Sequence, residues 1–130
     1  MGKLNEMFGS NGVVKIAALC FKAVTDAHIT HLLQPDKTLA RHLAFEKFYD
    51  GDIVDIVDGL VETYMGLYDI KEISVESCSK INDPISYFTK LYNDIDSTRK
   101  DIKESFIQNQ IDTIQEEITH TLYRLKNITT

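Results

Sequence analysis

The sequence is poor in cysteine and proline and has no tryptophan, with two cysteines and two prolines in 130 residues. Cys20 and Cys78 are too few for a disulfide-stapled fold, so we expect a reducing, cytoplasmic setting. The segment 1–12 lacks a secretory pattern and is expected to be a flexible lead-in. No apolar run approaches the roughly 20 residues that a membrane-spanning helix needs, so no membrane association is expected.

Positive charge is also scarce, because 14 lysines and arginines face 20 aspartates and glutamates, for a net charge of −6. Such a balance repels nucleic acids and anionic membranes, and neither is an expected partner. The chain is still long enough for one domain with a real core, since roughly two thirds of the unfolded surface of a chain this size is buried on folding. We expect this domain to span residues 13–130.

Apolar residues recur at helical spacing through two segments of the first half. From Val13 the period predicts a helix over about 13–34, which Pro35 ends by disfavouring helix at the residue before it. A second helix is predicted over about 39–67. Gly51 and Gly59 each weaken it by about 1 kcal/mol relative to alanine, so either can mark a bulge or a close helix contact.

The second half predicts two more helices. Asp83 followed by Pro84 is a helix start, with a capping residue and then proline at the first helical position. The apolar stripe continues to Phe106 and then changes phase, which predicts a break near 108–110. The expected helices therefore span about 84–107 and 109–127, after a polar connection over 69–83.

This layout predicts an all-α fold. Short turns between the first two and the last two helices make each pair antiparallel, and the long connection allows a crossover along the bundle. That arrangement is a ferritin-like four-helix bundle, and a plain up-down bundle is the alternative.

Metal-ligand side chains gather between residues 28 and 62, at or near helical spacings of three and four that place members of a pair on one face. They are His28, His31, His42, Glu46, Asp58 and Glu62. Imidazole and carboxylate together suit iron, manganese or zinc. The plainer alternative is that His31, which lies on an apolar stripe, is a buried structural histidine and that the acids form a solvated face.

The stretch from His31 to Leu67, with a histidine and an acid four apart at 42 and 46 and an Asp-x-x-x-Glu at 58–62, resembles the Dps family of mini-ferritins. Residues 115–125 are similar to that family's last helix. The resemblance implies a hollow dodecamer that oxidises Fe(II), preferably with hydrogen peroxide, and stores the iron as mineral.

The resemblance also implies where iron binds, at a site between two subunits. His31, His42 and Glu46 of one subunit would face Asp58 and Glu62 of its neighbour. His42 stands one residue earlier than in the family pattern, and a π-bulge near Gly51 would restore the shared face. Without such a bulge, Asp55 is the substitute ligand.

Other residues receive simpler interpretations. His28 is expected to be a neighbour of the metal site, and His120 is expected to be a structural residue. Tyr49 is expected to pack in the core or an interface, Cys20 to be inert, and Cys78 to be an accessible thiol. No lysine-rich tail is present, so DNA binding is not expected.

The functional hypothesis is therefore a homo-oligomeric ferroxidase that sequesters iron. The alternative is a metal-free ferritin-like scaffold that binds other proteins through the helix at 39–67 or the connection at 69–83. A virus-encoded protein of either kind would act in the host cytoplasm or the virion.

Overall fold

The computed structural model describes residues 12–33 and 39–127, and these residues form helices and connections without a strand. The all-α class is thus confirmed. The first helix, predicted over about 13–34, is confirmed over residues 12–33, so Gly12 of the expected lead-in is helical. Residues 1–11 of that lead-in and residues 34–38, which include the predicted helix end, lie outside the described residues. The helices are α2 (Gly12–Leu33), α3 (Leu39–Tyr49), α4 (Ile53–Met65), α5 (Pro84–Thr98), the short 3-10 turn η1 (Arg99–Asp101) and α6 (Ser105–Lys126).

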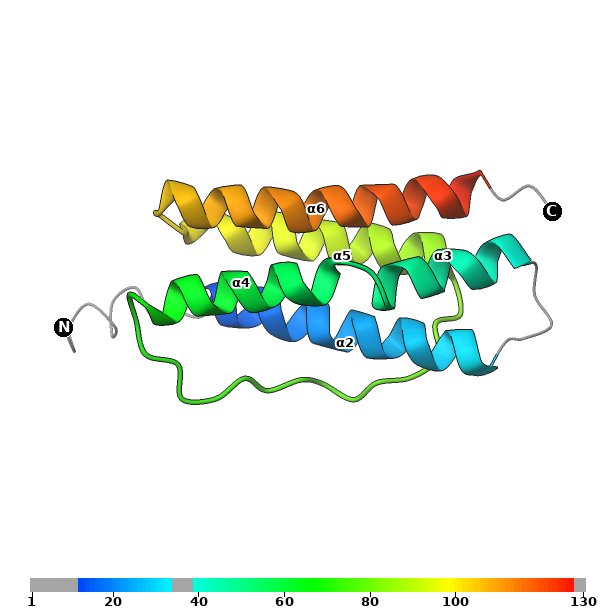
Figure 1. Ribbon diagram of the computed structural model, residues 1–130, viewed down its shortest axis with the longest axis horizontal. Helices are drawn as coiled ribbons and strands as arrows, with labels where there is room; N and C mark the ends of the chain where they lie inside the picture. The colour runs from blue at the N-terminus through cyan, green and yellow to red at the C-terminus, as the bar shows by residue number, and fades with distance from the viewer. Residues whose placement is uncertain (1–11, 34–38, 128–130) are drawn as a thin grey trace.

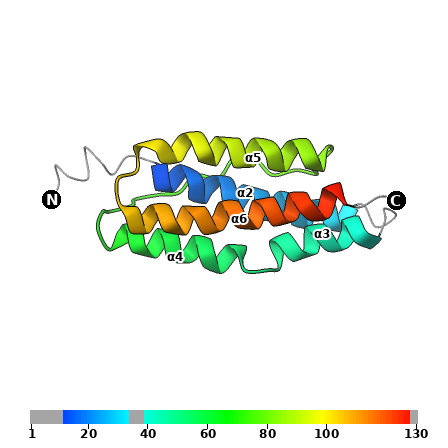
Figure 2. The same ribbon diagram turned by 90° about the horizontal axis from the view of Figure 1, so that it is seen from above.

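The helices lie side by side as an elongated bundle (Figure 1). α3 and α4 follow one another along one side, and both contact α2 and α6, while α5 packs on α6 and α2. α4 and α5 run in the same direction, because the connection at 66–83 returns along the length of the bundle before α5 begins (Figures 1 and 2). In the described parts of the chain, no helix combines the length and hydrophobicity of a membrane span.

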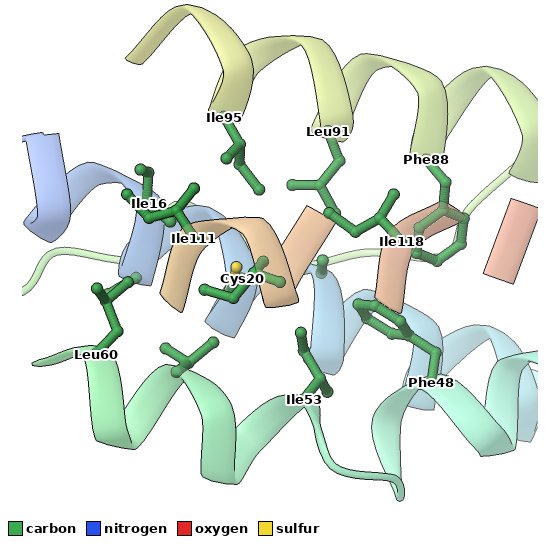
Figure 3. Packing of buried hydrophobic residues seen from close by; sticks show 14 of the residues in the cluster. Ile16, Cys20, Phe48, Ile53, Leu60, Phe88, Leu91, Ile95, Ile111 and Ile118 are labelled. Carbon is green, nitrogen blue, oxygen red and sulfur yellow. The ribbon is translucent and has the colours of Figure 1, made fainter. Parts of the chain in front are cut away.

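The core is built from the apolar stripes of all the α-helices (Figure 3). Buried side chains from the helices interdigitate along the bundle axis, and those labelled in the figure are Ile16, Cys20, Phe48, Ile53, Leu60, Phe88, Leu91, Ile95, Ile111 and Ile118. Burial of side chains of this size stabilises the fold by about 1.5–3 kcal/mol each before the entropy of ordering is subtracted. In α2 the apolar residues at helical spacing from Val13, which include Ile16, Ala17, Cys20 and Ala27, are buried.

The predicted helix at 39–67 is wrong in one respect, because it is two helices separated by a turn at residues 50–52. The hydrogen bond from Asp50 N to Glu46 O (2.9 Å) is at the end of α3, and the bond from Ile56 N to Asp52 O (3.0 Å) is at the start of α4. At Gly51 the chain passes so close to the preceding turn that an added Cβ would lie 2.3 Å from the carbonyl oxygen of Lys47. Glycine thus permits a full break where a π-bulge was expected.

The predicted break near 108–110 is also wrong, and the helix expected at 84–107 is too long. The break lies at 102–104, where η1 has ended and α6 has not begun. The side-chain amide of Gln108 donates to the carbonyl oxygens of Arg99 (2.8 Å) and Ile102 (2.7 Å), and Arg99 Nε donates back to Gln108 Oε1 (2.6 Å). The polar residue that suggested a break therefore lies inside α6 and closes the turn before it.

Buried polar groups of α2 hold the end of the long connection. The Asp26 side chain is 1% exposed and accepts the Ser79 backbone N–H at 2.7 Å and the Tyr87 hydroxyl at 2.6 Å. One turn later, the Thr30 hydroxyl accepts the Ile81 backbone N–H at 2.7 Å. Buried backbone groups outside regular structure need such partners. The connection is therefore fastened to α2 before α5 begins.

Candidate metal centre

The end of α2 and the beginning of α3 place two histidines and a glutamate together. His31 lies in the last turn of α2, and His42 lies near the start of α3 with Glu46 one turn further on. Residues four apart on a helix share a face, so His42 and Glu46 both face the neighbouring α2. The packing of α3 against α2 then brings His31 to the same point.

The three side chains are near enough to share one metal ion. One ligand atom from each of His31, His42 and Glu46 lies within 4.8 Å of the other two, and all three residues are half-buried. Atoms bound to one ion through bonds of about 2.1 Å lie at most about 4.2 Å apart, so the side chains would have to move together, and the stacked histidine rings would have to turn, before all three could bind one ion. This is the one such group of histidine, cysteine or acidic side chains within residues 12–33 and 39–127.

Stacking between the two rings sets the geometry of the group. The centroids of His31 and His42 are 3.7 Å apart with 29° between the planes, and His31 Nδ1 lies 3.4 Å from the carbonyl oxygen of His42. If the His31 Nδ1 carries the proton and donates to the His42 carbonyl oxygen, the Nε2 of His31 is the nitrogen that can bind a metal. An ion held by two imidazoles and one carboxylate would keep positions open for further ligands, as in the two-histidine, one-carboxylate sites of non-haem Fe(II) proteins.

Two aromatic neighbours border the cluster of His31, His42 and Glu46. The Tyr49 ring meets the His31 ring edge-on, with centroids 5.3 Å apart, and stacks on the exposed His28 at 4.2 Å and 10°. Desolvation, followed by the charges of Glu46 and Asp50, raises the pKa of Tyr49. His28 thus lies beside the cluster with Tyr49 between its ring and His31.

Asp58 and Glu62 lie elsewhere on the chain. Both are exposed on α4, beyond the break at 50–52, and neither belongs to the group formed by His31, His42 and Glu46. Asp55, the substitute ligand, is exposed on α4 as well. His120 is exposed on α6, with Nδ1 3.9 Å from a carboxylate oxygen of Glu117. Of the five predicted ligands, the fold of one chain therefore brings three together.

A surface hollow of about 470 Å³ adjoins the cluster at the break between α3 and α4, across from α6. Its charged lining contains four carboxylates and two cations, from Glu46, Asp50, Asp52, Glu117, Lys47 and Arg124. Glu46 belongs both to the cluster and to this hollow. The part that α6 contributes was not predicted, since nothing in the sequence around residue 117 indicates which helix it faces.

Comparison with known proteins identifies the family but no relative of known function. The profile of a family of unknown function (DUF5856) matches residues 35–125, and the chain therefore belongs to that family. The match includes His42, Glu46, Asp58 and Glu62, whereas His31 precedes it. Searches of curated proteins and of solved structures found no match.

Proposed function

We propose that this member of the DUF5856 family is a Dps-like protein that binds Fe(II), oxidises it with peroxide or dioxygen, and sequesters the iron. The observation that carries the proposal is the cluster of His31, His42 and Glu46, whose ligand atoms lie within 4.8 Å of one another. These are the same three residues that the resemblance to the Dps family assigned to one subunit of the iron site.

The helix arrangement supports the same proposal. α4 and α5 run in parallel and are joined by a connection along the whole bundle, while α2 with α3–α4 and α5 with α6 form antiparallel pairs. A four-helix bundle with one long crossover of this kind is ferritin-like. In such bundles, metal sites are built from histidine and carboxylate side chains that project from facing helices.

The chemistry of the cluster fits iron as a substrate. Imidazole nitrogens and a carboxylate oxygen suit Fe(II), and carboxylates hold the harder Fe(III) after oxidation. Glu46 belongs to the cluster and also lines the hollow, where four carboxylates outnumber the two cations of Lys47 and Arg124. Carboxylates in a concave surface raise the local concentration of cations. Iron would thus reach the histidines by way of Glu46.

A second copy of the chain would complete the site in this proposal. Asp58 and Glu62 are exposed on α4 and are free of the intrachain cluster, so a neighbour can present them to it. Four leucines near His31 and His42 in the sequence are also exposed over 42–70% of their surface, namely Leu32, Leu33, Leu39 and Leu43. Large apolar side chains left exposed in one chain can be covered when a second copy packs on them. We therefore expect a homo-oligomer, a dodecamer if the Dps arrangement holds.

The test is anaerobic loading of the purified chain with Fe(II), followed by peroxide, with Fe(III) absorbance recorded against a protein-free control. The double variant His42→Ala/Glu46→Ala is expected to lose binding and rapid oxidation, whereas His120→Ala keeps both. Asp58→Ala/Glu62→Ala is expected to lose rapid oxidation while circular dichroism stays unchanged. A wild-type trace that matches the protein-free control would overturn the proposal.

A metal-free scaffold is the second candidate, and the exposed leucines at the end of α2 and the start of α3 support it. Such a protein would keep the oligomer and bind other proteins through the same surface. A symmetric oligomer by light scattering, combined with no Fe(II) binding by the wild type, would favour the scaffold over the ferroxidase.

A further inference from the structure

We propose that the groove between α2 and α5 binds a small zwitterion of the amino-acid type, with its carboxylate on Lys15, its ammonium group on Glu76 and its apolar side chain on Leu19. The groove lies on the side of the bundle where the long connection runs along α2 (Figures 1 and 2). No described residue lines both this groove and the candidate metal cluster or the hollow beside that cluster. Binding in the groove therefore does not depend on the proposed iron chemistry.

Two adjoining cavities form the groove. Their volumes are about 380 Å³ and about 260 Å³, and they share lining residues from all three segments, namely Leu19, Lys22, Glu76 and Asp94. α2 and α5 supply most of the lining, and Ser74 and Glu76 of the connection supply the rest. Sites for small molecules in proteins usually have volumes of about 300–1,000 Å³. The larger cavity alone is therefore of a size that suits a small molecule.

The part of the connection that lines the groove is held in place from α2. Ser79, three residues after Glu76, donates its backbone N–H to the buried Asp26 at 2.7 Å. Ile81 donates its backbone N–H to the Thr30 hydroxyl, also at 2.7 Å. A ligand would thus meet a wall that is already positioned, and less entropy is lost when a binding site is formed in advance.

Two lysines of the groove are neutralised within the chain. Lys22 Nζ lies 2.6 Å from Asp26 Oδ2, and Lys90 Nζ lies 2.7 Å from Asp94 Oδ2. The hydrogen bond to Asp94, followed by the charge of Asp94, raises the pKa of Lys90. These two ion pairs leave no net charge for a ligand to compensate.

Lys15 and Glu76 are the opposite charges of the groove that remain. Both line the larger cavity, and within residues 12–33 and 39–127 neither side chain forms a hydrogen bond or an ion pair. Glu76 acts on Lys90 through its charge but is not bonded to it. A ligand with an anionic and a cationic group can bridge Lys15 and Glu76 through a charge-assisted hydrogen bond at each end. A ligand with one charge leaves one of the two uncompensated.

The other lining residues set the shape and polarity of the ligand. Ala18 and Leu19, with Leu91 in the smaller cavity, offer an apolar surface to an aliphatic side chain. The hydroxyls of Ser97 and Thr98 donate to carbonyl oxygens one helical turn earlier, so they offer a ligand lone pairs and no proton. An ammonium group is a donor of three hydrogen bonds and suits such acceptors.

The test is a titration of the isotope-labelled full chain with L-leucine, without iron, in which the amide resonances are followed by NMR. N-acetyl-L-leucine lacks the cationic group and L-leucinamide lacks the anionic group, so each removes one ionic contact. Lys15→Met and Glu76→Gln remove the same contacts from the protein, and both side chains are exposed, so neither variant threatens the fold. Lys126→Met and Glu116→Gln, at exposed residues of α6, are the matched controls.

We expect saturable binding of L-leucine, with resonance shifts confined to α2, α5 and residues 74–76. Each analogue, and each of Lys15→Met and Glu76→Gln, should raise the Kd at least about tenfold, because one charge-assisted hydrogen bond is lost. The control variants should bind as the wild type does. Equal binding of either analogue, or by either groove variant, would overturn the proposal.

The proposal would also be overturned if neither L-leucine nor L-phenylalanine shifted any resonance up to about 10 mM, a concentration beyond the range of specific binding. Since the titration contains no iron, that result would leave the proposed ferroxidase unaffected. Conversely, a protein that binds L-leucine but fails to bind Fe(II) would overturn the ferroxidase alone.

Discussion

The backbone N–H of Ser79 donates to Oδ1 of Asp26 at 2.7 Å, which joins the long connection to α2 across 53 residues of sequence. The other carboxylate oxygen of Asp26 accepts from the Tyr87 hydroxyl and from Lys22 Nζ, both at 2.6 Å. One buried carboxylate thus joins α2, the connection and α5. An acid in this position satisfies three donors at once, which explains why it lies in the core at 1% exposure.

We predict that Asp26→Asn destabilises the fold by about 2–4 kcal/mol. The amide is neutral and must turn its NH₂ group toward one of the donors, so at least one charge-assisted hydrogen bond becomes an unsatisfied buried contact. Urea unfolding followed by circular dichroism measures the change. Asp55→Asn, at an exposed acid on α4, is the control and is expected to stay within about 0.5 kcal/mol of the wild type. Equal stabilities of the two variants would contradict the structural role of Asp26.

The two glycines of the segment predicted as one helix should respond in opposite ways to alanine. At Gly51 an added Cβ would lie 2.3 Å from the Lys47 carbonyl oxygen, so we expect Gly51→Ala to destabilise by about 1–3 kcal/mol. At Gly59, inside α4, the nearest atom is Gln110 Nε2 at 3.9 Å. Gly59→Ala should therefore stabilise by up to about 1 kcal/mol through helix propensity.

Thermal unfolding of both variants tests this pair. A melting temperature that falls for Gly51→Ala and rises for Gly59→Ala would agree with a break at 50–52 that only glycine permits. If Gly51→Ala were as stable as the wild type, the helix would run through residue 51 in solution.

The two cysteines should differ in reactivity toward a disulfide reagent such as Ellman's reagent. Burial raises the pKa of the Cys20 thiol to about 12, and its side chain lies in the core, so the nucleophilic thiolate is neither formed nor reached. Cys78 is half-buried in the connection and is expected to react in the native protein. Titration should show one thiol per native chain and a second one in denaturant. Rapid native labelling that survives Cys78→Ala would show that Cys20 is accessible.

Much of the fold could be predicted because helix periodicity and capping are local. The cap at Asp83 is confirmed, since its side chain accepts the Ser86 backbone N–H at 3.2 Å before a helix that begins with Pro84. The turn at 50–52 depends instead on how closely two successive turns approach, and the break at 102–104 depends on which carbonyl groups Gln108 reaches. The spacing of apolar residues predicts neither the close approach at Gly51 nor the hydrogen-bond partners of Gln108.

The candidate site likewise has a part that helical spacing predicted and a part that depends on the folded structure. His42 and Glu46 share a helix face by spacing alone, and the predicted meeting with His31 needed only an antiparallel turn between the first two helices. The tyrosine beside them was assigned a packing role, because periodicity does not show that Tyr49 meets His31. Asp26 received no interpretation, since a lone acid on an apolar stripe gives no sign of the partners that fold onto it.

The last prediction concerns stability at alkaline pH. The Tyr68 hydroxyl donates to Glu104 Oε2 at 2.5 Å, and this hydrogen bond, with desolvation second, raises the pKa of Tyr68 from 10.0 to about 12. The protonated phenol is favoured in the folded state. The unfolded chain therefore loses this proton first as the pH rises, and the contribution of Tyr68 to stability is complete below about pH 10 and is lost toward about pH 12.

Urea midpoints measured at several pH values across that window test the assignment. The wild type is expected to lose stability steadily, and burial raises the pKa values of Tyr64, Tyr87 and Cys20 in the same direction. Tyr68→Phe should be less stable at neutral pH and should lose less between pH 10 and 12, because it has no phenolic proton to release. Tyr123→Phe, at an exposed tyrosine, should follow the wild-type profile. A Tyr68→Phe profile parallel to the wild type would mean that the hydrogen bond to Glu104 does not form in solution, since the phenol would then titrate alike in both states.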